Sequence, residues 1–158
     1  MQLIAWVKYA HLLFSFVFVA ALFATHWNVL AARRTQDWTV RAALFGLNQR
    51  ISVMFGLGAL LGLGLVGNFL AMQMGYSMKT TAVFRIVNGL WLASMTLSLA
   101  VDLPASMKLA TLARSAATGP NGSDPVEWGN TLGRWRVGNA AQLLLFLSLL
   151  YFMVSPWQ

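Results

Sequence analysis

Long apolar runs separated by short polar segments dominate the chain. Four such runs cover about residues 3–30, 51–74, 82–103 and 137–154. A helix that crosses a bilayer needs about 20 mostly apolar residues, and lipid tolerates only helices and closed barrels as spanning structures. The runs do not alternate between apolar and polar residues as barrel strands do. The pattern predicts an all-α integral membrane protein, folded as an antiparallel four-helix bundle in a single domain over residues 1–158.

The polar segment before the second run indicates a helix that extends beyond the bilayer. Thr35 is a plausible N-cap, and no helix breaker separates it from the second run. We therefore expect one continuous helix from about Gln36 to Met74. The alternative is a short interfacial helix that places Trp38 and Phe45 among the lipid headgroups.

Two proline-containing segments bear on the ends of the third and fourth helices. The sequence DPVE at 124–127 predicts a capping box, with Asp124 as the N-cap and Glu127 closing the box. The fourth helix then starts well before the membrane. Pro104 is expected to kink or end the third helix.

Charge is distributed unevenly between the two sides of the predicted bundle. The net charge is +7, but the basic residues follow the loops and do not suggest a nucleic-acid partner. Only Lys8, Lys79 and Arg85 belong to the side of the termini. The positive-inside rule therefore places both termini outside and both long loops in the cytoplasm. The loops between helices one and two and between three and four carry the other basic residues: Arg33, Arg34, Arg41, Arg50, Lys108, Arg114, Arg134 and Arg136.

Both histidines lie on the first predicted helix. His11 and His26 are about 22 Å apart along a helix axis, so they cannot share one metal ion in a monomer. For His26 we expect an interfacial position. His11 lies deeper, where polar residues usually face the bundle interior. It is either hydrogen-bonded to a neighbouring helix or a ligand of haem or a metal.

Polar residues on the third run recur at alternating steps of three and four residues. Arg85 either extends toward the outer surface or binds an anionic or polar group, such as a haem propionate, a quinone carbonyl or a lipid phosphate. The full set forms one predicted seam: Arg85, Asn88, Leu92, Met95, Leu99 and Asp102.

Further polar residues are expected near the inner surface and on the last helix. Asp102 is expected to pair with Arg134 or Arg136. Asn139 and Gln142 share one helical face and can hydrogen-bond across the bundle.

The second run is rich in glycine between residues 56 and 67. Gly58 and Gly62 form a GxxxG pair, which allows close approach of a neighbouring helix. Glycine can equally leave space for a flat macrocycle.

Methionines gather at the turn between the second and third runs. Thioethers are soft ligands that suit Cu(I), although methionine is also an ordinary apolar filler. The copper hypothesis involves His11, Met72, Met74 and Met78.

The sequence lacks the patterns of independent catalysis. It has no cysteine, which excludes disulfides, thiolate zinc sites, iron–sulfur clusters and covalently attached haem. It also has no serine–histidine–acid set, phosphate loop or zinc-protease motif. We do not expect a stand-alone enzyme.

The terminal helices resemble a group of bacterial four-helix membrane proteins. The segment WVKYAHLLFSFVFVAALF resembles their first helix, and RWRVGNAAQLLLFLSLLYFMVSPW resembles their last. The group includes the copper-resistance D membrane domain, the four-helix membrane protoporphyrinogen oxidase and a set of predicted integral membrane proteins. The resemblance implies a link to b-type haem or copper through His11. Haem would be held by His11 with Met95, or by two copies of His11 in a dimer.

These observations together predict an accessory subunit of a redox system in the bacterial cytoplasmic membrane. It would bind b-type haem or a quinone inside the bundle, and it would contact lipid and either further copies of itself or subunits of a membrane complex. The alternatives are a cofactor-free structural subunit and a copper-handling protein. The expected cofactor site comprises His11, Arg85, Asn88, Met95 and Gln142.

Overall fold

Helices account for all the regular secondary structure in the described residues. The computed structural model describes residues 2–119 and 124–154. The helical elements are α1 (Gln2–Arg34), α2 (Trp38–Ile51), the π-helical η1 (Ser52–Leu57), α3 (Gly58–Gln73), α4 (Ala82–Leu97), the π-helical η2 (Ser98–Asp102), α5 (Leu103–Thr118) and α6 (Pro125–Val154).

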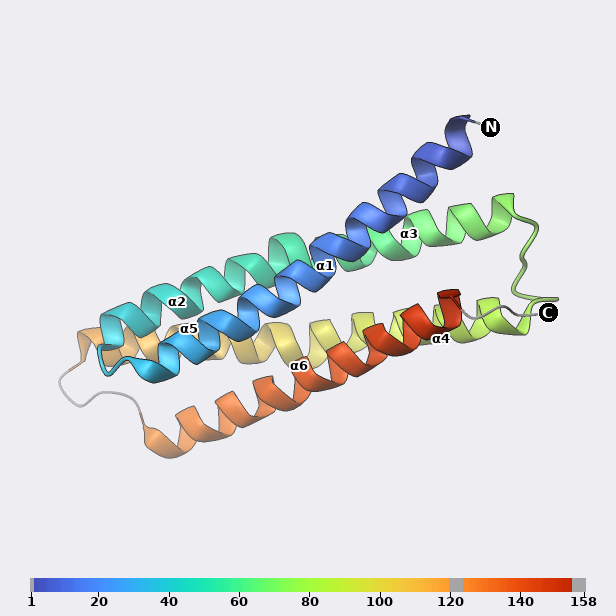
Figure 1. Cartoon of the computed structure of the whole chain (residues 1–158). Helices are drawn as coiled ribbons and strands as arrows, with labels where there is room; N and C mark the ends of the chain where they lie inside the picture. The colour runs from blue at the N-terminus through green and yellow to red at the C-terminus, as the bar shows by residue number, and fades with distance from the viewer. Residues whose placement is uncertain (1, 120–123, 155–158) are drawn as a thin grey trace.

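The elements join into four long helices that run antiparallel (Figure 1). No loop separates α2, η1 and α3, or α4, η2 and α5. Each long helix contains a window apolar enough to cross a membrane. The prediction of an all-α bundle is therefore confirmed, and the four candidate spans indicate a multi-pass membrane protein. They are Gln2–Arg34, Trp38–Gln73, Ala82–Thr118 and Pro125–Val154.

The second long helix is continuous and longer than the bilayer core. Its 36 residues correspond to about 54 Å, against a hydrocarbon thickness of about 30 Å. Phe45 is only 1% exposed inside the bundle, so the alternative of an interfacial helix is wrong. The predicted cap is also corrected. Asp37 is the N-cap, because its Oδ1 accepts a hydrogen bond from the Thr39 amide at 2.7 Å, whereas Thr35 Oγ1 accepts one from the Asp37 amide.

The third long helix does not end at Pro104. The π-helical η2 immediately precedes α5, which carries Pro104 in its first turn. Proline has no N–H to donate to the carbonyl of Ala100, four residues earlier. Arg134 Nη2 of α6 donates to that carbonyl at 3.0 Å. Thus α6 donates a hydrogen bond to the Ala100 carbonyl, to which Pro104 cannot donate one.

A well-packed core lies at the end of the bundle where α1 is joined to α2 and α5 to α6, here called the loop end. It includes Phe45, Leu109 and Trp135, each at most 2% exposed. Trp128 packs edge-on against Trp38 and Phe45, with ring centroids 5.1 and 5.2 Å apart. Water surrounds helices outside the bilayer, so burying these rings is favourable here.

Arg41 fastens the C-terminal end of α1 to α2. Its Nε donates to the carbonyls of Ala32 and Thr35 at 3.1 and 2.9 Å, and its guanidinium lies 4.4 Å from the centroid of the Trp38 ring. A cation at a helix C-terminus satisfies free carbonyls and complements the helix dipole.

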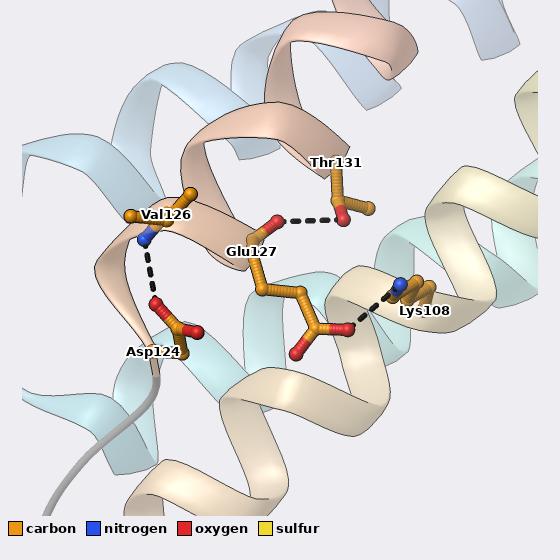
Figure 2. Close-up of polar contacts among 5 residues, drawn as sticks. All are labelled: Lys108, Asp124, Val126, Glu127 and Thr131. Atoms are coloured by element: carbon orange, nitrogen blue, oxygen red, sulfur yellow. Dashed lines mark hydrogen bonds and ion pairs between the residues drawn. The ribbon is translucent and has the colours of Figure 1, made fainter.

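The start of α6 is fixed by a cap and an ion pair (Figure 2). Asp124 Oδ1 accepts a hydrogen bond from the Val126 amide at 2.8 Å, which confirms the predicted N-cap. Glu127 differs from the prediction. Its carboxylate pairs with Lys108 of α5 at 2.8 Å and so links α6 to α5.

At the opposite end, here called the terminus end, the helices form two pairs. There α1 packs on α3, and α4 packs on α6. The start of α1, the end of α6 and the turn between α3 and α4 lie at this end (Figure 1). A cavity lined by all four long helices lies between these pairs.

A candidate ligand cavity between the helix pairs

The cavity at the terminus end has a volume of about 610 Å³ and is lined by all four long helices. Most of its wall is apolar or aromatic. Among the described residues, no lysine, arginine, aspartate or glutamate lines it. Its polar lining residues are His11, Ser15, Asn68, Tyr76, Thr81 and Asn88.

His11 enters the cavity wall by packing against a glycine of α3. A Cβ atom at Gly67 would lie 2.8 Å from His11 Cε1 and 3.2 Å from Nδ1, closer than ordinary contacts. Ser15 Oγ donates to the His11 carbonyl at 3.0 Å. The Nδ1 atom is buried and has no hydrogen-bond partner in the described structure. His11 therefore faces the bundle, with one ring nitrogen unused.

Aromatic rings pack closely against two further glycines of α3. A Cβ at Gly62 would lie 2.6 Å from the Phe14 ring, and a Cβ at Gly64 would overlap the indole of Trp91. Trp91 Nε1 donates to the carbonyl of Leu60 at 2.8 Å, which holds the indole against α3. Gly58 has no neighbour within 4 Å. The predicted GxxxG pair is therefore corrected: Gly62 serves close packing of a ring, and Gly58 does not.

Two asparagines add amide groups to the wall. Asn88 is 6% exposed, and its Nδ2 donates to the Phe84 carbonyl at 2.9 Å. Asn68 Nδ2 donates to the Gly64 carbonyl at 2.8 Å. An amide nitrogen carries two N–H groups, so each side chain keeps a second donor beyond these bonds.

The structure separates the residues predicted to share one cofactor site. His11 and Asn88 line the cavity. Arg85 does not; it is exposed and its Nη1 donates to the Lys79 carbonyl at 3.4 Å, in the turn between α3 and α4. Met95 packs deeper, against the buried core around Phe18. Gln142 lines a second, smaller cavity. Of the five residues predicted for the cofactor site, only His11 and Asn88 line this cavity.

The methionines of the copper hypothesis are not gathered around His11. Met72, Met74 and Met78 are all exposed, and only Met74 joins His11 in the lining. Within residues 2–119 and 124–154, no group of three or more His, Cys, Asp or Glu side chains is placed to hold a metal ion.

His26 and Asp102 lie away from this cavity. His26 is exposed, and its ring stacks on Trp135 with centroids 6.5 Å apart. Asp102 is not paired with Arg134 or Arg136 in the described part of the chain, because Arg134 bonds to a backbone carbonyl instead. That predicted ion pair is wrong.

The lining fits a neutral ring better than haem. Haem carries two negatively charged propionates, for which cations are the strongest partners, and no lysine or arginine among the described residues lines the cavity. Met95 does not line the cavity, so the predicted second axial ligand of haem does not lie beside it. His11 would be the one imidazole ligand in the wall.

Comparisons with protein-family models, with curated proteins and with solved structures find no match for this chain.

The sequence contained partial signals for the residues that it missed. Asn68 is a lone amide in an apolar run, which is a recognisable mark of an interior position. The role of Gly67 depends on the register between α1 and α3, for which the sequence holds no local signal.

Proposed function

We propose that this protein is a subunit of a membrane redox system that binds the ring of a lipid-soluble quinone in the cavity beside His11. A quinone ring is flat, neutral and apolar, and it carries two carbonyl acceptors. The observation that carries the proposal is an uncharged, aromatic-lined cavity whose wall includes His11, a histidine with a buried ring nitrogen that has no hydrogen-bond partner in the described structure. The second N–H of Asn88 supplies a further donor.

The rim of the cavity suits an isoprenoid tail. Met74, Leu150 and Met153 line the cavity and are also exposed. An apolar tail can therefore leave the cavity along side chains that face lipid. Trp91 and Phe84 offer aromatic surface to the ring, and offset stacking contributes about 0.5–1.5 kcal/mol beyond area burial.

Charge and resemblance support the proposed membrane and the proposed orientation of the chain in it. Eight basic residues belong to the loop end, which supports a cytoplasmic loop end and external termini. The likeness of the terminal helices to the bacterial four-helix group supports a redox role in the cytoplasmic membrane. The rival hypothesis, a cofactor-free structural subunit, does not require a cavity beside His11.

Quinone binding is tested by titrating the purified protein in nanodiscs with short-tailed ubiquinone and menaquinone analogues. We expect saturable quenching of tryptophan fluorescence at one ligand per chain. His11→Leu should weaken binding about two- to tenfold, the range expected for one neutral hydrogen bond.

The matched control is His26→Leu, since His26 lies outside the cavity and is exposed. It should bind with the affinity of the native protein. Quenching that does not saturate, or equal losses in the two folded variants, would contradict the proposed site.

A further inference from the structure

A second cavity of about 40 Å³ lies near the middle of the bundle, where the apolar runs end on the loop side. Both π-helical segments contribute to it. In a π-helix the regular hydrogen-bond ladder is displaced, and such segments often occur at functional sites. Oxygen-bearing side chains from all four long helices line it: Thr25, Ser52, Ser98, Asp102, Asn139 and Gln142.

Two of these side chains have buried polar atoms that lack hydrogen-bond partners among the described residues. Gln142 is 1% exposed, and neither its Oε1 nor its Nε2 has a hydrogen-bond partner in the described structure. The same holds for Asp102 Oδ1. Burying an amide or a carboxylate without a partner is costly. The arrangement therefore indicates that a small ion or molecule binds between Asp102 and Gln142.

The approach of Asp102 to α6 depends on a glycine. A Cβ atom at Gly138 would overlap the Asp102 carboxylate and lie 3.0 Å from Val101. Gly138 therefore gives the carboxylate room against α6, the helix that carries Gln142.

The donor set and the charge select a monovalent cation. Hydroxyl, amide and carboxylate oxygens are hard ligands, which suit alkali and alkaline-earth ions and not soft metals. A single carboxylate balances one positive charge. A volume of about 40 Å³ admits an ion with at most one or two waters.

We propose that this cavity binds a sodium ion through Asp102 and Gln142, at the level of the two π-helical segments, both of which line it. Discontinuous membrane helices use a similar principle, in which displaced backbone carbonyls coordinate Na⁺. Arg134 is exposed and bonded to the Ala100 carbonyl, and it forms no ion pair with Asp102 in the described structure. The ion would join all four helices at one level and so stabilise the bundle.

The test measures the melting temperature of the purified full chain in NaCl and in N-methylglucamine chloride at equal ionic strength. Sodium should raise it saturably, by roughly 5–10 °C at a hundredfold excess over Kd. The increase should be lost in Asp102→Asn and reduced in Gln142→Leu. Glu127→Gln makes the same chemical change as Asp102→Asn at the loop end, on a carboxylate paired with Lys108, and should keep the increase.

Equal melting temperatures in the two salts would overturn the proposal. Water would then be the occupant of the smaller cavity. A sodium effect that persists in folded Asp102→Asn would overturn it as well. Direct ²³Na relaxation measurements on the native protein separate binding from stability, so the proposal is tested even if a variant fails to fold. Quinone titration of the same samples is independent, because the two cavities have no lining residue in common.

Discussion

Replacing Trp135 by alanine should lower the free energy of unfolding by about 3–5 kcal/mol, the range for truncating a large aromatic residue in a core. Trp135 is 2% exposed at the loop end and packs with Val29 and Leu109. Truncation leaves a cavity among side chains on helices that other contacts hold in place, such as the Arg41 cap and the Lys108–Glu127 pair. These neighbours cannot collapse fully into the space.

Denaturant titration in mixed micelles measures this difference. The matched control is Trp27→Ala, because Trp27 is 69% exposed and its removal opens no internal cavity. We expect a loss below about 1 kcal/mol for the control. Similar losses for the two variants would mean that the loop end is not the packed core described above.

Filling the ligand cavity with an indole should reduce quinone affinity at least tenfold. Ala71 of α3 lines the cavity, and Ala71→Trp places a large ring where the ligand ring would lie. The steric effect does not depend on which donor binds which carbonyl. It should therefore exceed the two- to tenfold loss expected for removing one hydrogen bond at His11.

The control for this variant is Ala93→Trp. Ala93 is exposed on α4 and lines a shallow outer groove with Leu144 and Ser148. Fluorescence is ambiguous when tryptophans are added, so isothermal titration calorimetry should measure the affinity. Unchanged affinity in Ala71→Trp would place the ligand elsewhere.

The existence of the four helices could be predicted because length and apolarity are properties of each segment alone. The continuous helix through Phe45 followed from the lack of a breaker. The N-cap was misplaced by two residues because Thr35 and Asp37 are both good caps. The choice depends on local geometry, in which Thr35 Oγ1 accepts from the Asp37 amide.

The predicted seam on the third helix does not lie on one buried face. Asn88 is buried, but Leu92 and Leu99 of the same seam are 55% and 49% exposed. The π-helical η2 then changes the phase before Asp102. No residue type in this segment predicts a π-helix. The helical spacing of the sequence therefore could not assign Asp102 and Gln142 to one cavity.

The candidate site was partly predictable for a physical reason. A histidine or asparagine within an apolar run is costly unless it faces the interior, and His11 and Asn88 do line the cavity. Arg85 was misassigned because a long side chain near the end of a span can reach the surface. The divergence of the two helix pairs, which creates the cavity, depends on packing between distant segments.

The most direct test of the central claim is photoaffinity labelling with an azido-quinone in nanodiscs, followed by peptide mapping. We expect labelling of cavity-lining segments, around His11 on α1, Gly67 to Ala71 on α3 and Phe84 to Trp91 on α4. An excess of unlabelled quinone should suppress it. Labelling confined to residues outside the cavity, or labelling that unlabelled quinone does not displace, would contradict the account.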